Sequence, residues 1–497
     1  MTLDAVAAAV AGLAASVAVA RVLGPRDLGY YSYMLWAVVA AGAAGALGIP
    51  AAARKYAAEY LGAGRPGAAL AVVSRAWRLQ TAAACATSAL ALLAVSIWAP
   101  PGLRAFALLG AASILPGMLM DVPTALAAAA QRSRAAVVPS LAAAAANVAG
   151  IALALTLGWG LAGLAAAFLA ARLVDFALRA RSSAQIAAWL RGAPGGSDGA
   201  LEAGFHRRMR RFCASAAVLQ FLNLVVWDRS EVFFLARYCD IREVAFYSIP
   251  FNITAQLLLF ARAFSSSSAA ALMHRIGGSR AAAAAQLPVL FRALGFIMLP
   301  VLLGAAALSG PLIHVLFGED YGAAAPVLAL LSVCAIARAA LTPLLLAFAA
   351  FDIQARAVKV TAGCAALNLA LDLLLIPSRG ALGAAVANGI AQCAAACLLF
   401  AVLAAEARVH IGFRPLLRLS GAAAAAVAPA AALAFAGPPW FALAAGTTSG
   451  AVLYLPLVRR TGAIGREDAE RLARLLPLLP APARGPSGRL LLWLTSR

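Results

Sequence analysis

The sequence predicts an all-α integral membrane protein that crosses the bilayer about fourteen times. Of its 497 residues, 64% are hydrophobic and only 12% are charged, whereas soluble globular proteins are about 25% charged. Apolar runs of about 20 residues, long enough to cross the hydrocarbon core as helices, recur along the whole chain. The runs are continuous rather than alternating, which favours helices over a membrane β-barrel.

The first apolar run ends in an Ala-x-Ala pattern like that of a signal peptide. However, a signal peptide starts with a positively charged segment, whereas the residues before this run include the acidic Asp4 and no Arg or Lys. We therefore interpret the run as a transmembrane helix. Each later run between charged or turn-forming connections is assigned one helix. The predicted helices are residues 3–20, 30–52, 79–99, 105–128, 135–157, 161–180, 212–235, 244–266, 293–316, 323–348, 358–376, 381–404, 418–436 and 440–458.

One segment occurs twice, once in each half of the chain. Residues 20–32 and 236–248 align at a constant offset of 216 residues, so that Arg21 matches Arg237. Each copy lies between two long apolar runs. A repeat of this period in a hydrophobic chain indicates duplicated membrane halves, as in many transporters.

Basic residues alternate between successive connections. With the N-terminus in the cytoplasm, the even-numbered connections hold most Arg and Lys residues, beginning with Arg54 and Lys55, whereas the other side holds few and carries Glu319 and Asp320. This agrees with the positive-inside rule and predicts that both termini are cytoplasmic. Abundant Arg and Ala beside scarce Lys is typical of a GC-rich bacterial genome, so we expect a multi-pass protein of the bacterial cytoplasmic (inner) membrane.

The longest internal connection divides the predicted helices into two matching sets. It contains the linker-like segment Ala-Pro-Gly-Gly-Ser-Asp-Gly at 193–199. A short Gly-x-x-Gly echo, at Gly160 and Gly380, opens the last predicted helix of each set. The predicted parts are an N-terminal six-helix lobe at 1–180, a cytoplasmic linker at 181–211, a C-terminal six-helix lobe at 212–404, two extra helices at 405–458, and a cytoplasmic tail at 459–497 with a short amphipathic helix at 466–478.

Three passages resemble the polysaccharide-biosynthesis flippases, the Wzx-like branch of the MOP exporter superfamily. That superfamily includes the lipid II flippases and the MATE multidrug exporters. The passages occur in family order across nearly the whole chain. They are Ala-Arg-x-Leu-Gly-Pro-x-Asp-x-Gly-x-Tyr-Ser at 20–32 with Gly48 and Arg54 after it, Asp228-Arg229 ahead of the repeat copy ending Tyr247-Ser248, and Leu-Phe-Gly-Glu-x-Tyr at 316–321 followed by Asn368 and Ile-Pro-x-x-Gly-x-x-Gly-Ala-Ala at 376–385.

The resemblance implies two six-helix lobes in a V that opens alternately to each side of the membrane. It also implies a flippase that moves an undecaprenyl-pyrophosphate-linked oligosaccharide from the inner to the outer leaflet. Such a protein serves the assembly of O-antigen, capsule or exopolysaccharide. Its implied partners are the lipid-linked substrate, membrane lipid, and the polysaccharide polymerase with its chain-length machinery.

An anionic pyrophosphate headgroup requires a cationic cavity, and three arginines are candidates for it. Arg262 and Arg338 lie inside predicted membrane helices, where an ionisable side chain is costly and therefore a functional candidate. Arg binds phosphate through two charge-assisted hydrogen bonds. Arg54 matches the basic position that follows the second helix in the family. The alternatives are a structural pair or an extension to the inner surface for Arg262 and Arg338, and a topology anchor for Arg54.

The predicted helix 212–235 carries a polar stripe. Gln220, Asn223 and Glu231 are spaced for one helical face, and Asp228 lies beside it. A polar stripe on a membrane helix faces protein or water rather than lipid. Asp228 and Glu231 are therefore candidates for gating or ion coupling, and a local Asp228-Arg229 pair is the alternative.

Two further acidic residues are candidates for gating or ion coupling. Asn368 and Asp372 share one face of the predicted helix 358–376. A desolvated carboxylate takes up a proton or binds a cation, so Asp372 is a candidate for proton or sodium coupling, with structural pairing as the alternative. Asp121 lies between Pro116 and Pro123, which allow a bend that gating would use.

Other polar pairs are expected to be structural. Arg172 and Asp175, three residues apart in the predicted helix 161–180, are expected to form an ion pair. Asn388 and Gln392, four apart, are expected to bind neighbouring helices to each other.

The sequence has no catalytic or metal-binding signature. Its four His residues are isolated, its seven Cys residues lack clustered ligand spacing, and no phosphate-binding Gly-Lys-Ser/Thr run is present. The net charge of +21 does not indicate nucleic-acid binding, because no soluble stretch is large enough to fold alone.

The prediction is thus a transporter that is not an enzyme and needs no cofactor beyond a coupling proton or sodium ion. One alternative is a MATE-type cation-coupled multidrug exporter, whose cavity would be acidic. The other is a membrane polymerase or ligase of lipid-linked glycans. Such enzymes usually have a large extracytoplasmic loop, and the predicted topology has none.

Overall fold

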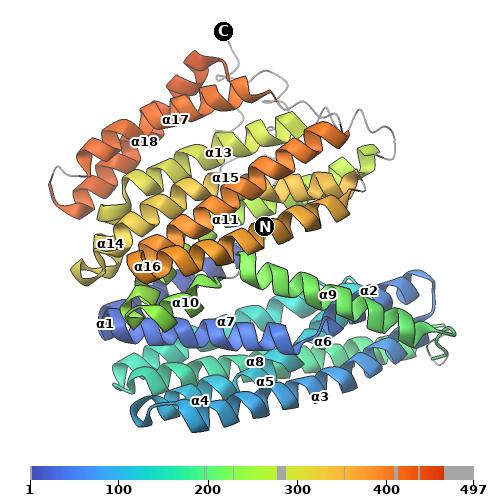
Figure 1. Cartoon of the computed structure of the whole chain (residues 1–497). Coiled ribbons are helices and arrows are strands. Elements are labelled where there is room, and N and C mark those ends of the chain that lie inside the picture. Colours follow the sequence, from blue (N-terminus) through green and yellow to red (C-terminus); the bar gives the residue numbers. More distant parts are fainter. Residues whose placement is uncertain are drawn as a thin grey trace. The chain divides into compact units, whose positions relative to one another are not determined.

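The computed structural model describes residues 3–194, 196, 199–227, 229–276, 287–351, 353–407, 412–434 and 437–463. Over these residues the regular structure is helical, without strands (Figure 1). The chain forms two compact units, Met1–Phe233 and Phe234–Arg497, and each is described by itself. The predicted amphipathic helix at 466–478 lies outside the described residues.

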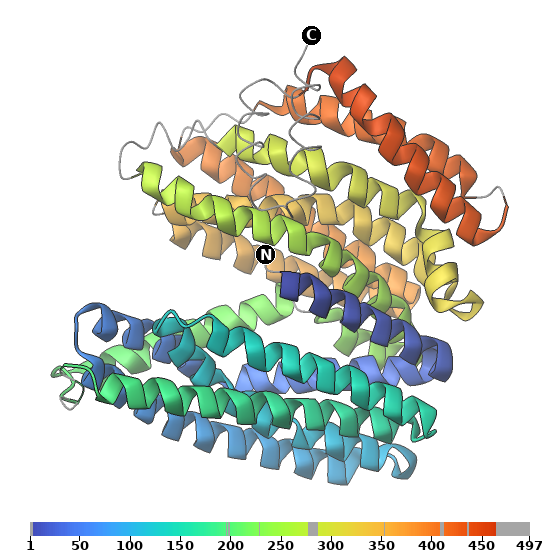
Figure 2. The same ribbon diagram turned by 180° about the vertical axis from the view of Figure 1, so that it is seen from behind.

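The first unit is a bundle of long and short helices. α7 and α8 lie side by side along most of their length (Figure 2). The elements are α1 (Leu3–Gly45), α2 (Ile49–Gly62), α3 (Pro66–Trp98), the 3₁₀ turn η1 (Pro101–Leu103), α4 (Arg104–Ala112), α5 (Ile114–Leu119), α6 (Asp121–Ala129), α7 (Arg134–Thr156), α8 (Gly160–Arg191) and α9 (Phe205–Trp227). The short helix α10 (Glu231–Tyr238) spans the boundary between the units.

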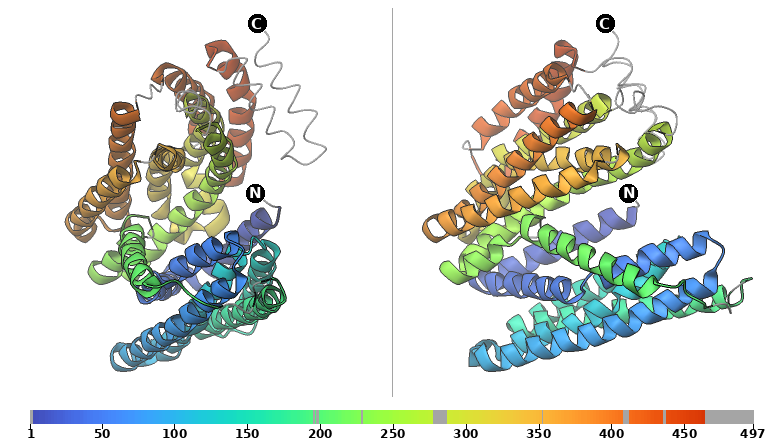
Figure 3. Two further views of the ribbon diagram at one scale, coloured as in Figure 1. Left: turned by 90° about the vertical axis from the view of Figure 1, so that its right-hand side faces the viewer. Right: turned by 45° about the vertical axis from the view of Figure 1, so that its right-hand side comes forward.

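The second unit contains the remaining helices. α17 and α18 pack against each other and α17 packs against α13 (Figure 3). The α17–α18 contact is close: a Cβ on Gly446 of α18 would lie 3.1 Å from Ala430 Cβ on α17. The same Cβ would lie 2.8 Å from Cδ2 of Leu308, between α13 and α14. The elements are α11 (Ile241–Ile276), α13 (Leu287–Ala307), α14 (Ser309–Phe317), the 3₁₀ turn η2 (Glu319–Tyr321), α15 (Ala324–Ala350), α16 (Gln354–Ala407), α17 (Phe413–Leu433) and α18 (Pro439–Thr461).

Among the described residues, nine helices are long and apolar enough to cross a membrane, or ten if the bent pair Ala14–Gly45 and Ile49–Gly62 counts as one span. α16 contains two of the predicted helices, 358–376 and 381–404, joined across a kink at Gly380. The predicted helices 3–20, 212–235 and 244–266 are not counted, because each includes side chains outside the described part. The protein is therefore a multi-pass membrane protein.

Both copies of the sequence repeat adopt a helix, a break and a second helix. In the first copy the break lies at Gly24, whose φ of 76° and ψ of 177° interrupt α1. In the second copy it lies between Tyr238, the end of α10, and Ile241, the start of α11. The repeat therefore places a helix break at the same point of both copies, and Gly24 gives the first break a positive φ that the second does not have.

The shorter Gly-x-x-Gly echo also has one structural role in both copies. Gly160 and Gly380 have φ values of 56° and 53°, a region that glycine enters without strain. In the second unit the Glu243 carboxylate, from the longer repeat, accepts a 2.7 Å hydrogen bond from the Ala381 amide. A carboxylate at the start of a helix stabilises its free N–H groups, so the two motifs support each other.

Three connections predicted on the same side of the membrane meet at one end of the first unit. Arg65, between α2 and α3, donates a 2.7 Å hydrogen bond to the Ala200 carbonyl between α8 and α9. The Arg132 guanidinium, between α6 and α7, lies 4.3 Å from the ring centroid of Trp189. This grouping agrees with the predicted alternation of connections within this unit.

The division into compact units falls after Phe233, whereas the sequence places the linker at 181–211 and begins the second lobe at 212. The reason is the packing of α9. Phe205, which is 2% exposed, contacts the rings of Tyr56 and Tyr60 on α2. Gly48, between α1 and α2, approaches α9 so closely that a Cβ there would lie 2.9 Å from Ala216 Cβ.

Candidate functional site

A cavity of about 200 Å³ lies among α1, α5, α6, α8 and α9 of the first unit. Most of its lining is apolar, but three polar side chains contribute to it: Asp121, Arg172 and Gln220. The sequence singled out Asp121 and Gln220 as candidates for function. It assigned Arg172 to a structural ion pair.

A break between α5 and α6 places Asp121 at this cavity. Pro116 and Pro123 cannot donate backbone hydrogen bonds, so carbonyl groups of the preceding turns lose their helical partners. Next to this break, the Gln80 amide donates to the Met118 carbonyl at 3.1 Å. The Met120 carbonyl accepts from the Thr124 backbone amide at 3.1 Å and from the Thr124 hydroxyl at 2.7 Å. Asp121 then begins α6, so a helix break lies where the sequence predicts a bend.

The ion pair expected between Arg172 and Asp175 is replaced by another. Asp175 accepts a 2.6 Å charge-assisted hydrogen bond from Arg179, one turn further along α8. Arg179 also donates to the Thr124 hydroxyl of α6 at 3.0 Å and to the Ser140 hydroxyl of α7 at 2.6 Å. Arg179 and Asp175 are both buried, so this network joins three helices.

Arg172 is left with weaker contacts. Its guanidinium donates to the Met120 sulfur at 3.9 Å and lies 5.0 Å from the ring centroid of Phe168. It also interacts electrostatically with Asp175 and, less strongly, with Asp121. The sequence contained a signal for the Asp175–Arg179 pair, because an Asp four residues before an Arg is the favoured order for an ion pair within a helix.

The polar stripe on α9 and α10 is only partly described. Gln220 is half-buried and lines the cavity. Glu231 is fully buried at the first position of α10. Asp228 and the side chain of Asn223 lie outside the described residues.

The polar face predicted on α16 is buried in the second unit. Asn368 and Asp372 are both 0% exposed, and the Asn368 amide donates to the Asp372 carboxylate at 3.2 Å. After the kink in the same helix, Asn388 and Gln392 are also buried, and Gln392 donates to Asn388. The structure thus contains two polar pairs within an apolar helix.

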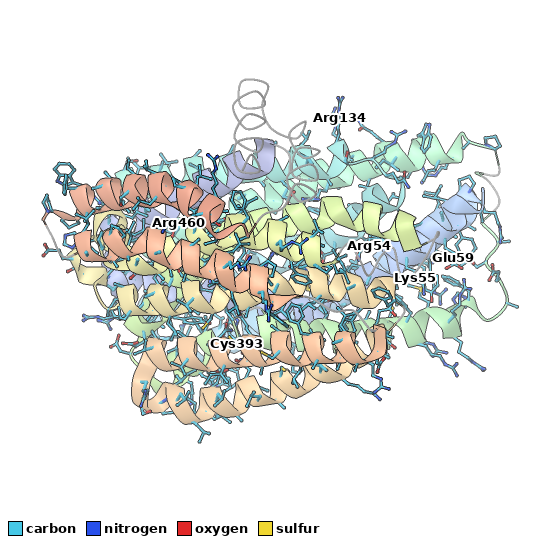
Figure 4. The ribbon with its side chains drawn as sticks, turned by 90° about the horizontal axis from the view of Figure 1, so that it is seen from above. Arg54, Lys55, Glu59, Arg134, Cys393 and Arg460 are labelled. Carbon is cyan, nitrogen blue, oxygen red and sulfur yellow. The ribbon has the colours of Figure 1, made fainter. Side chains whose placement is uncertain are left out.

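The three candidate arginines differ in their surroundings. Arg54 is exposed on α2, on the same helix as Lys55 and Glu59 (Figure 4). Arg262 is exposed on α11. Arg338 is half-buried on α15, with its guanidinium 5.0 Å from the ring centroid of Phe251 on α11. A cation over an aromatic face is stabilised, so Arg338 is held against the helix pair α11–α15 of the second unit.

Within the described residues, no group of three or more His, Cys, Asp or Glu side chains is arranged to hold a metal ion. The polar groups of the cavity are an arginine, a carboxylate and an amide. These can donate and accept hydrogen bonds, and they include no nucleophile paired with a base.

No protein-family profile matches the sequence, and no curated protein matches it. The structure, in contrast, is similar to that of a lipid II flippase, MurJ, in an inward closed conformation. The TM-score is 0.73 at 12% identity, over 92% of this chain and 97% of the flippase.

Two MATE structures are also similar. An inward-facing multidrug resistance MATE transporter of the MOP superfamily gives a TM-score of 0.61 at 17% identity, over 82% of this chain and 95% of the transporter. A MATE crystal structure in complex with MaD3S gives 0.57 at 17% identity, over 82% and 93% of the two chains. The chain therefore has the fold shared by the lipid II flippases and the multidrug exporters of the MOP superfamily.

Proposed function

We propose that this protein is a flippase that moves an undecaprenyl-pyrophosphate-linked oligosaccharide from the inner to the outer leaflet of the cytoplasmic membrane. The observation that carries the proposal is the similarity to a lipid II flippase over nearly the full length of both chains. The three sequence passages that resemble the Wzx-like branch support the polysaccharide substrate.

The charge distribution supports an anionic rather than a cationic substrate. The candidate site residues include three arginines beside the carboxylates, whereas the cavity of a cation exporter would be acidic. Arg338 lies in the middle of α15, where its insertion costs roughly 2.5–3.5 kcal/mol on translocon scales. In the proposed mechanism Arg338 binds the pyrophosphate, and Arg54 and Arg262 assist at the cytoplasmic side.

The buried Asn368–Asp372 pair is the proposed site of proton or sodium coupling. A carboxylate with an amide neighbour in an apolar helix provides the oxygen ligands that a small cation or a proton requires. Asp121, Asp228 and Glu231 are proposed to act in gating or coupling. We also propose that both termini are cytoplasmic. The polysaccharide polymerase and its chain-length machinery would act on the flipped product.

The test uses purified protein in liposomes that contain an undecaprenyl-pyrophosphate-linked trisaccharide with a fluorophore on its terminal sugar. Membrane-impermeant dithionite bleaches only the outer leaflet, so a flippase raises the bleached fraction above that of protein-free liposomes. No increase would exclude the proposed function. Efflux of ethidium from the same liposomes, without flipping of the lipid, would favour the MATE-type exporter.

The same assay tests the role of Arg338. Arg338→Ala removes charge-assisted hydrogen bonds worth about 1.5–3 kcal/mol, so flipping should slow by about 10- to 100-fold while expression stays normal. Arg338→Lys should restore flipping only in part, because Lys lacks the planar fork. Arg379→Ala, at an exposed arginine of the same unit, is the matched control. A well-expressed Arg338→Ala protein that flips at the wild-type rate would remove Arg338 from the mechanism.

A further inference from the structure

The cavity of the first unit contains hydrogen-bonding groups that the described structure does not use. The Asp121 carboxylate and the Gln220 amide form no side-chain hydrogen bond with any described residue. Arg172 donates to a thioether, which is a weak acceptor. Directly beside them, Arg179 is satisfied by Asp175, Thr124 and Ser140. Arg172 and Asp121 interact electrostatically with Asp175 and Arg179, but their hydrogen-bonding groups face the cavity.

The charges in the cavity oppose each other. Arg172 would attract an anion that Asp121 repels, and Asp121 would attract an organic cation that Arg172 repels. The neighbouring Arg179–Asp175 pair is neutral as a whole. The site therefore favours an uncharged ligand with both donors and acceptors. Vicinal hydroxyl groups have this property, since each hydroxyl donates once and accepts twice.

The cavity is partly open, and its volume indicates how much of a ligand it can enclose. Its volume of about 200 Å³ corresponds to roughly six or seven waters at about 30 Å³ each. Pockets for drug-sized ligands begin at about 300 Å³. The apolar part of the lining, which includes Val38, Met118 and Met120, offers contact to the C–H face of a ring. One monosaccharide ring has the size and the mixed surface that this site requires.

We propose that the first unit binds one uncharged sugar residue of the transported glycan through Asp121, Arg172 and Gln220. This inference rests on the proposed flippase function and adds a glycan subsite to it. Arg172 and Gln220 donate to sugar hydroxyls, Asp121 accepts from them, and the apolar lining contacts the ring. The subsite recognises the glycan separately from the pyrophosphate, which Arg338 binds.

The experiment is saturation-transfer NMR on the full-length protein in nanodiscs, with three probes: methyl glucoside, methyl galactoside and N-acetylglucosamine. A single sugar ring should bind with a dissociation constant on the order of millimolar, which this method detects. We expect at least one probe to receive saturation from the wild-type protein. That signal should be lost in Gln220→Leu, which is of similar size and leaves no unpaired charge, and in Arg172→Gln.

Arg181→Gln, at an exposed position of the same helix, is the matched control and should keep the signal. Thermal unfolding of each variant shows whether it is folded. If Arg172→Gln does not fold, the result for Gln220→Leu decides the outcome. Absence of signal from all three probes, or an undiminished signal in Gln220→Leu, would overturn the proposal. Displacement of the sugar by inorganic pyrophosphate would also overturn it, because it would show an anion site.

The two proposals fail separately. Sugar binding that is lost in Gln220→Leu, without lipid flipping in liposomes, would retain the subsite and exclude the flippase. Flipping without any sugar signal would retain the flippase and exclude the subsite.

Discussion

The Arg179 network provides a quantitative test of how the first unit is held together. Arg179→Met keeps most of the side-chain volume and removes the guanidinium that links α8 to α6 and α7. Asp175, which is 7% exposed, then remains buried without its cation. Thr124 and Ser140 lose less, since their hydroxyls still donate to the backbone carbonyls of Met120 and Ala136, at 2.7 and 3.1 Å.

The expected cost is dominated by the uncompensated carboxylate. Removing one partner of a buried ion pair costs about 3–5 kcal/mol, whereas replacing both partners with apolar side chains is often close to neutral. We therefore expect Arg179→Met to lower the stability of the first unit by about 3–5 kcal/mol. The double variant Arg179→Met/Asp175→Leu should lie within about 1 kcal/mol of the wild type.

The measurement is the thermal unfolding midpoint of detergent-solubilised protein, followed by size-exclusion chromatography after heating. A unit of this size shifts by about 2–4 °C per kcal/mol, so Arg179→Met should unfold about 6–20 °C earlier. Arg181→Met, at an exposed arginine of the same helix, should leave the midpoint unchanged. A double variant that is as unstable as the sum of its two single variants would refute the reasoning, because the charges would then act independently.

Three further predictions concern the second unit and the topology. Gly446→Ala places a Cβ against α17 and should destabilise the protein by about 1–3 kcal/mol. Its control, Gly421→Ala, places a Cβ in open space and should stabilise the protein by up to about 1 kcal/mol. Equal shifts of the unfolding midpoint in the two variants would contradict the packing at Gly446. In a cysteine-free background, an impermeant maleimide added from outside should label Asp320→Cys and miss Ala203→Cys; the reverse pattern would invert the topology. Asp372→Asn should abolish the dependence of flipping on a proton or sodium gradient, and an unchanged dependence would assign the coupling elsewhere.

Local sequence patterns determined the fold class. Helix length and apolar composition depend only on neighbouring residues, and the 216-residue repeat is visible when the two halves are compared. The helical membrane fold and the two helix breaks could therefore be predicted. The breaks at Gly24 and Gly380 follow from the same local chemistry, since both positions require a positive φ. For the candidate site, the sequence indicated Asp121 and Gln220 by their polarity within apolar helices, but it did not place them at one cavity.

Tertiary structure decided which polar groups are satisfied and which face a cavity. Along α8, both three-residue and four-residue spacings bring side chains together, so sequence alone allowed Asp175 to pair with Arg172 or with Arg179. The choice fell to Arg179 because Thr124 and Ser140, 55 and 39 residues away, accept its remaining donors. Arg172 is thereby left to the cavity. Contacts between residues so distant in the chain are set by helix packing, which no local pattern specifies.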